Sequence, residues 1–183
     1  MSSKKRIDVI GAGGVGSWLI PVLAKKYDVR VIDGDDFEPN NRERQNFPNS
    51  KLYENKAKAM GQRFEPVFLT DKDQLDADLV VCCTDTAESK QICLSAGMPV
   101  VIAGNETYSS EAYLYVPGKT DNPAEYYTED GETGHDCRRD PQTVEANFMA
   151  AAMALKLVQM FFDPEWNGVH HMRGSRFAIG VEA

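Results

Sequence analysis

The sequence predicts an α/β fold: a mainly parallel sheet covered by helices, with antiparallel strands added in the C-terminal half. Through residue 107, short apolar runs alternate with segments of helical periodicity, which is typical of parallel strands joined by helices. The first apolar run ends in a glycine-rich turn that leads into a helix. After residue 107 the pattern changes, because the run 111–116 alternates as an antiparallel strand does.

The elements of the first half follow one another in a regular order. Residues 7–10 predict the first strand, the apolar spacing after the glycines predicts a helix, and residues 29–32 predict the second strand. Residues 52–64 have a helical pattern, 67–69 are a weak strand candidate, and 78–84 are a stronger buried strand. A helix over 86–96, closed by Gly97, and a strand over 99–103 complete this half.

The second half is expected to hold a long loop, a long helix and a last strand over 177–181. Residues 117–140 have no apolar periodicity and carry many acids, glycines and prolines, which predicts a mobile loop of the functional kind. Asp140 and Pro141 suit the cap and first turn of a helix over 141–162. An apolar stripe along this helix is expected to be buried in the core or against a second subunit; it comprises Val144, Phe148, Ala152, Leu155 and Phe162.

Length and composition predict a single domain, residues 1–183, with a nucleotide-binding half over 1–107 and a second half over 108–183. The net charge of -8 argues against nucleic acid or anionic membrane as a partner. The charged start is not followed by the apolar core of a signal peptide, and no apolar stretch of 18 residues is recognised. Four cysteines show no zinc-site spacing, so we expect reduced thiols, no structural zinc and a cytoplasmic location.

The glycine turn predicts a nucleotide site. Its four motif glycines stand between a strand and a helix, where the backbone can approach a phosphate and the helix N-terminus offers N–H groups; they are Gly11, Gly13, Gly14 and Gly16. Asp33 ends the second strand 22 residues after Gly11, close to the spacing at which such folds place an acid on ribose hydroxyls. The Rossmann-like interpretation therefore leads.

Three features near this turn have two interpretations each. The stretch 33–45 is rich in turn-forming residues and is either a solvated loop or a binding loop. Lys56 is either a surface lysine or a phosphate ligand. Asp85, at the end of a strand and the start of a helix, is either an N-cap or a ligand-binding group.

Several motifs together resemble the ThiF/MoeB group of adenylyltransferases, which are similar in fold to ubiquitin-activating enzymes. The resemblance rests on the glycine turn 11–17, on the ungapped stretch 33–45, on Lys56 and on residues 83–85. It covers about residues 6–107 firmly and the helix from residue 141 loosely.

The resemblance implies ATP-dependent activation of a carboxylate, usually the C-terminal glycine of a ubiquitin-like or sulfur-carrier protein, giving an acyl-adenylate and pyrophosphate. It implies that Asp33 holds the ribose, with Asp35 in the same nucleotide-binding motif, and that Asn41, Arg44 and Lys56 hold phosphates. Gln45 continues the motif, and Asp85 binds the magnesium–ATP unit. Arg44, Lys56 and Asp85 are then the catalytic residues, because displacement at a phosphate needs positioned cations and a metal anchor. No general base is required, since the attacking carboxylate is already ionised.

Other implications concern partners and departures from the family pattern. Members that dimerise bring an arginine from a helix before the first strand, and here that arginine is either missing or supplied by Arg6 or by the pair 138–139. Cys137 is either a loop cysteine or an acceptor of the acyl group or sulfur. A homodimer is expected. Two rival functions stay open: a non-catalytic ATP-binding scaffold of the same fold, and an NAD-dependent oxidoreductase, which would leave Asn41, Arg44 and Lys56 without a role.

Overall fold

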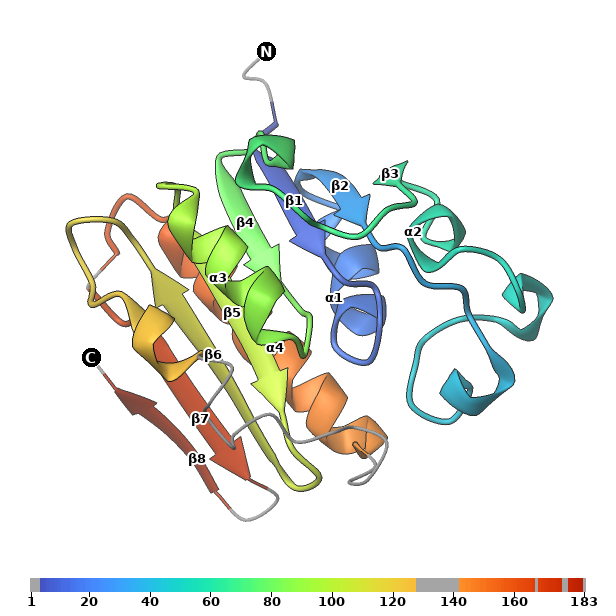
Figure 1. The fold of residues 1–183 in the computed structure, drawn as a ribbon. Coiled ribbons are helices and arrows are strands. Elements are labelled where there is room, and N and C mark those ends of the chain that lie inside the picture. Colours follow the sequence, from blue (N-terminus) through green and yellow to red (C-terminus); the bar gives the residue numbers. More distant parts are fainter. Residues whose placement is uncertain (1–3, 128–141, 167, 176–177, 183) are drawn as a thin grey trace.

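A computed structural model describes residues 4–127, 142–166, 168–175 and 178–182 of the chain. Its strands form a single eight-stranded sheet in the order β3-β2-β1-β4-β5-β6-β7-β8 (Figure 1). The predicted loop over 117–140 is described only as far as residue 127, where it contains a 3-10 turn, Pro123–Tyr126.

Five parallel strands build the first part of the sheet. Their bounds are Arg6–Ile10 for β1, Asp28–Ile32 for β2, Arg63–Glu65 for β3, Leu79–Cys82 for β4 and Val100–Asn105 for β5. In the register of the sheet, Ile10 pairs with both Ile32 and Cys82. The carboxyl ends of β2, β1 and β4 are therefore level, so the segments that follow these three strands meet at one edge of the sheet.

The antiparallel part comprises β6 (Ser109–Tyr115), β7 (His171–Ser175) and β8 (Ala178–Glu182). All three pair antiparallel to their neighbours, starting with β6 against β5. The predicted antiparallel strands are confirmed, with β8 in place of 177–181. Sequence reasoning missed β7 because its residues, His-Met-Arg-Gly-Ser, show no apolar alternation.

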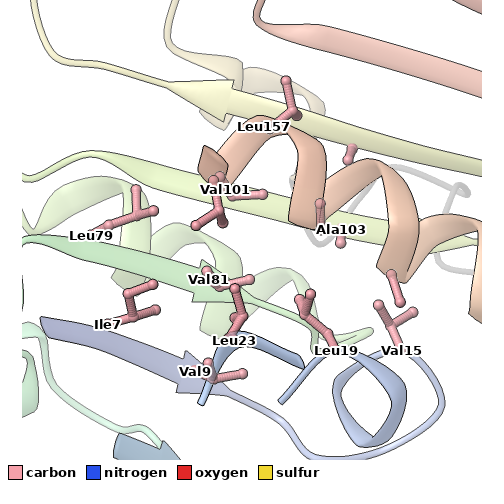
Figure 2. Packing of buried hydrophobic residues seen from close by; sticks show 14 of the residues in the cluster. Ile7, Val9, Val15, Leu19, Leu23, Leu79, Val81, Val101, Ala103 and Leu157 are labelled. Carbon is pink, nitrogen blue, oxygen red and sulfur yellow. The ribbon is translucent and has the colours of Figure 1, made fainter. Parts of the chain in front are cut away.

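The helices cover both faces of the sheet. Helix α1 (Gly16–Leu23) and helix α4 (Val144–Phe161) lie on one face, and α3 (Ala87–Ser95) lies on the other (Figure 1). Alternate residues of one strand serve the two cores: Val81 of β4 packs with α1 and α4, whereas Val80 packs with the α3 side. Figure 2 shows the first core, with Val9, Val81 and Val101 of three strands directed toward the helices. This two-sided burial is what the continuous apolar strand pattern predicted.

Residues 52–69 differ from the prediction. The expected helix shrinks to α2 (Lys56–Ala59), because Gly61 takes a left-handed backbone conformation with φ of 68° just after its end. The strand lies at β3, not at 67–69, where Val67 and Phe68 are exposed. Short apolar runs do not distinguish strands from loops, and this prediction was wrong for that reason.

Helix α4 also begins and faces differently from the prediction. Thr143 caps it, accepting a hydrogen bond from the N–H of Ala146, whereas Asp140 and Pro141 lie outside the described residues. Its buried face is made largely of alanines, and Phe148 is 58% exposed. The predicted stripe was therefore out of phase. Small residues on the inner face let the helix approach β5 and β6 closely. The prediction missed this face because it placed mainly the large apolar side chains toward the core.

The prediction that the chain has no apolar stretch of 18 residues is wrong for α4. Its 18 residues have a mean hydropathy of 1.2 and contain two charged side chains, so by length and composition they suffice to cross a membrane. The helix instead packs against β5, β6 and α1. That packing accounts for its apolar character.

Candidate functional site

Three turns converge at the carboxyl edge of β1, β2 and β4. The N–H of Gly11 donates to the carbonyl of Ile32 at 2.9 Å, and the N–H of Cys83 donates to the carbonyl of Ile10 at 2.8 Å. Gly11 has φ of 88°, and a Cβ on it would lie 3.1 Å from Cγ2 of Thr84. A side chain at this position would be strained and crowded. The glycine turn is thus tied to the segments after both neighbouring strands.

Two further glycines are required by close packing inside the turn. A Cβ on Gly16 would lie 2.0 Å from the carbonyl oxygen of Gly11, and a Cβ on Gly14 would lie 2.3 Å from Oδ1 of Asn147. Gly13 has more space, with Gln45 Nε2 at 3.7 Å from its would-be Cβ. Val15 at the N-cap of α1 gives no side-chain cap to the helix. The turn is therefore tight and leads into a helix start without a side-chain cap. Its predicted role in binding a phosphate group stays a prediction.

Asp33 is buried and connects the glycine turn to the following loop. Its Oδ2 accepts a hydrogen bond from the N–H of Ala12 at 2.6 Å, and its Oδ1 accepts one from the N–H of Asp35 at 2.8 Å. Burial raises the pKa of Asp33 above its ordinary value, while these two N–H groups and the Lys56 ammonium act in the opposite direction. The carboxylate therefore lies beside the glycine turn, and its predicted role in holding a ribose stays a prediction.

Lys56 is buried with its charge paired. Its Nζ lies 3.1 Å from Oδ2 of Asp35, and its backbone N–H donates to the carbonyl of Asp35 at 2.8 Å. The predicted surface alternative for Lys56 is therefore wrong. Asn55, which sequence reasoning missed, fixes this arrangement by donating from Nδ2 to the carbonyls of Asp33 and Asp35 at 2.9 and 3.1 Å. Because asparagine at a helix start is a common cap, its second contact gave no signal in the sequence.

Asn41, Arg44 and Gln45 form a compact turn beyond this loop. Oδ1 of Asn41 accepts a hydrogen bond from the N–H of Glu38, and the Asn41 carbonyl accepts from the N–H groups of Arg44 and Gln45. Asn41 and Gln45 are buried, and Arg44 is partly buried with its Nη1 donating to Oε1 of Gln142 at 3.3 Å. The stretch 33–45 thus combines buried anchors, such as Asn41 and Gln45, with exposed residues such as Asp35 and Arg42. Its role as a binding loop stays a prediction.

Two residues from outside the loop hold the backbone of Arg44. Trp18 Nε1 and Asn147 Nδ2 each donate to the Arg44 carbonyl at 3.3 Å. Neither was recognised as a site residue from the sequence. Asn147 gave one available signal, a polar residue on a helix whose neighbouring inward positions are apolar.

Asp85 follows β4 at the same edge and is exposed. It is not the cap of α3, because Thr86 occupies that position and accepts a hydrogen bond from the N–H of Ser89 at 3.4 Å. That correction removes the N-cap interpretation of Asp85. Its magnesium role stays a prediction.

Arg6, a candidate for the arginine of the phosphate site, lies away from the glycine turn. Arg6 begins β1, at the opposite edge of the sheet from the glycine turn, and pairs there with Asp76 at 2.9 Å. It therefore does not supply the missing arginine within this chain. A cavity of about 780 Å³ lies at that opposite edge, lined by Arg6, Arg63 and Asp78 among others, so it is remote from the candidate site.

The described cysteines lie in the hydrophobic core or pack against it. Cys82 and Cys93 are fully buried. Burial raises the pKa of the Cys83 thiol, and the pKa of Cys93 is raised by its hydrogen bond to Cys82 and by burial. Cys137 and the pair 138–139 lie outside the described residues.

A family model matches the part of the sequence that contains the glycine turn. Residues 2–70 match the profile of the ThiF family. This stretch holds the glycine turn, the loop 33–45 and Lys56, so the resemblance to the ThiF/MoeB-type adenylyltransferases is confirmed there. No curated protein sequence matches the chain significantly.

Solved structures share the fold over nearly the whole chain. Escherichia coli MccB with succinimide superposes with a TM-score of 0.78 and 20% identity, covering 97% of this chain and 63% of that chain. E. coli MccB with ATP gives 0.74, 19%, 97% and 63%, and PaaA gives 0.72, 20%, 97% and 62%. MccB is also known with AMPCPP and MccA together. The chain thus has the Rossmann-like fold of these proteins and spans less than two thirds of their length.

Proposed function

We propose that this chain binds ATP at the carboxyl edge of β1, β2 and β4 and uses it to adenylylate a carboxylate. The observation that carries the proposal is the convergence of the glycine turn, Asp33 and the buried Lys56 ammonium at one edge of the sheet, within the stretch that matches the ThiF family. The crystallisation of the similar protein MccB with ATP supports it.

The residues suit a nucleoside triphosphate. The glycine turn and the start of α1 receive phosphates, and the Asp33 carboxylate accepts hydrogen bonds from ribose hydroxyls in addition to its two backbone donors. The buried ammonium of Lys56 exchanges its pairing with the half-exposed Asp35 for a phosphate oxygen. Arg44 and the amide nitrogen of Asn41 act on the same group, and Asp85 would anchor Mg²⁺, which adds positive charge beside the phosphates.

The reaction follows from this placement. A carboxylate oxygen of the acyl substrate attacks the α-phosphorus of ATP, the bond from that phosphorus to the bridging oxygen breaks, and pyrophosphate leaves with the electron pair. Lys56 and Arg44 stabilise the charge that gathers on the phosphate oxygens. We propose the C-terminal glycine of a ubiquitin-like or sulfur-carrier protein as the acyl substrate, supported by the ThiF match and by the known complex of MccB with MccA.

Pyrophosphate exchange into ATP tests the proposal. The wild type, given carriers that end in Gly-Gly, should exchange labelled pyrophosphate, and Lys56→Ala should reduce the rate about 100-fold because a cation at the phosphates is lost. Lys58→Ala on the exposed side of the same helix is the matched control and should be neutral. Asp85→Ala should also abolish exchange.

Two other results would point to the rival functions. ATP binding without exchange for any carrier would favour a scaffold of the same fold. Binding of NAD in place of ATP would favour an oxidoreductase and overturn the proposal.

We further propose a cytoplasmic homodimer. Support for self-association comes from Phe148, which is 58% exposed and stands edge-on to Trp18 with ring centroids 5.6 Å apart, on the outer side of α1 and α4. Sedimentation of the wild type should give a dimer that Phe148→Glu dissociates. The same charge at exposed Phe64 should leave the mass unchanged.

A further inference from the structure

We propose that Asn147 is a positioning residue that holds Arg44 against the glycine turn, so that α4 governs the geometry of the phosphate site. This inference rests on the proposed function for the role of Arg44. It goes beyond that function by assigning a role to a residue of the second half of the chain, outside the stretch that matches the ThiF family.

The side chain of Asn147 contacts both parts of the phosphate site at once. It is fully buried, its Nδ2 donates to the Arg44 carbonyl at 3.3 Å, and its amide fills the space where Gly14 lacks a side chain. The would-be Cβ of Gly14 lies 2.3 Å from Oδ1 and 2.9 Å from Nδ2 of Asn147. One amide group therefore fixes the distance between the glycine turn and the Arg44 backbone.

The orientation of this amide is determined by its surroundings. Arg44 O is an acceptor, so only Nδ2 can face it, and rotation of the amide by 180° would set two oxygens against each other. Oδ1 in turn is buried with no hydrogen-bond partner among the described residues. Burying an unpaired amide oxygen is unfavourable. A leucine of similar shape would avoid that cost, so stability alone does not account for asparagine here.

Residues near Asn147 also hold Arg44 in place. Trp18 Nε1 is the second donor to the Arg44 carbonyl, and Phe148, next to Asn147, packs edge-on against the Trp18 ring. Gln142, just before α4, accepts a hydrogen bond from the Arg44 guanidinium. The start of α4 thus contacts the backbone and the side chain of Arg44. A shift of this helix would move the cation relative to the phosphates.

The first test measures the loop without nucleotide. In Asn147→Leu, the amide protons of Arg44 and Gln45, which donate to the Asn41 carbonyl, should exchange with deuterium about tenfold faster, the loss expected for one hydrogen bond. Amides of β1 and β4 should exchange as in the wild type, and the melting temperature should be unchanged or higher. A merely structural asparagine would instead lower the melting temperature and leave the loop unaffected, which would overturn the inference.

The second test asks whether Asn147 acts through Arg44. Asn147→Leu should weaken ATP binding about tenfold in the wild-type background and less than twofold in Arg44→Ala, because the positioned group is then absent. Equal loss in both backgrounds would overturn the inference. Gln159→Leu, an amide-to-leucine change on the exposed side of α4, should have no effect on either readout.

Two further variants keep the tests decisive. Asn147→Asp retains the shape but sets a carboxylate against the Arg44 carbonyl, so it should also accelerate loop exchange. Trp18→Phe removes the other donor while keeping an aromatic ring, and should give a smaller change of the same kind. If the wild type binds no ATP, the proposed function fails, whereas the exchange measurements still decide whether Asn147 anchors the loop.

Discussion

At the scale of single residues, buried polar side chains gather at one edge of the sheet. Of the eight buried polar or charged residues in the part of the chain that the structure describes, six lie at or beside the candidate site: Ser17, Asp33, Asn41, Gln45, Lys56 and Asn147. Burying such groups is costly unless each is paired, and Gln45 and Asn147 each retain an amide oxygen without a partner among the described residues. Stability alone would not select this arrangement, which agrees with a binding role for the edge.

Asp33 should make stability depend on pH in a defined direction. Its pKa in the folded chain lies above that of the unfolded chain because of burial, so the folded state binds the proton more readily. Its contribution to stability is therefore largest below the unfolded pKa and decreases as the pH rises through the folded pKa. In thermal unfolding between pH 3 and 7, the melting temperature of the wild type should fall relative to that of Asp33→Asn as the pH increases. The opposite slope would contradict the burial argument.

Alanine at Gly14 and alanine at Gly16 should both destabilise the chain, but only the loss at Gly14 should be reduced by the second substitution Asn147→Ala. Gly14→Ala should cost about 1–3 kcal/mol through overpacking against the Asn147 side chain, and Asn147→Ala should recover part of that loss in the double variant. Gly16→Ala instead meets the backbone oxygen of Gly11, so Asn147→Ala should give no recovery there. Urea denaturation of the five variants (three single and two double) provides the comparison. Equal recovery at both glycines would show that the clash at Gly14 does not involve Asn147.

At the scale of elements, the phase of α4 decides which alanines tolerate enlargement. Ala154 is fully buried between the helix and the sheet, whereas Ala152 is exposed. Ala154→Leu should lower the free energy of unfolding by about 1–3 kcal/mol, because the close approach of the helix leaves no room for added methyl groups. Ala152→Leu should change it by less than about 0.5 kcal/mol. Chemical denaturation measures both, and a larger effect at Ala152 would restore the phase that the apolar pattern suggested.

The strands after which the site forms could be predicted because local pattern and burial agree there. The run ending at Ile32 has apolar residues at Val29, Val31 and Ile32, is closed by Asp33, and lies in a sheet covered on both faces. Other elements depend on tertiary contacts that no local pattern contains. Strand β7 exists because His171 and Met172 pair with β6, and Phe148 faces outward because alanines approach the sheet.

The site was predictable where a motif encodes backbone geometry and unpredictable where contact comes from distant residues. Gly11, Gly14 and Gly16 are needed for reasons that the motif implies, namely a left-handed turn and close approach. Asn55 and Asn147 contact the same loop through side-chain hydrogen bonds, Asn55 to the carbonyl of Asp33 from 22 residues away and Asn147 to that of Arg44 from 103 residues away. Such pairings leave no periodic signal in one sequence.

At the scale of the whole molecule, the two halves of the chain share one core and one site. Helix α4 covers the face of β5 and packs against α1, and its Leu157 lies in the same cluster as Ile7, Val81 and Val101 (Figure 2). The eight-stranded sheet runs through both halves without interruption. The first half therefore lacks a complete hydrophobic core without the residues after 107.

This dependence predicts the behaviour of a fragment of residues 1–107. Val9, Val81 and Val101 lie on the face of the sheet that α1 and α4 cover, and removing α4 would expose part of this face. The fragment should therefore lose cooperative unfolding and bind dyes that report exposed apolar surface. Mixing it with a second fragment of residues 108–183 should restore a cooperative thermal transition if the two associate, because the same core is rebuilt. Calorimetry of the fragment alone, the mixture and the full chain measures this. A cooperative transition for 1–107 alone would show that the first half is an independent domain and that α4 contributes to the site without being needed for the fold.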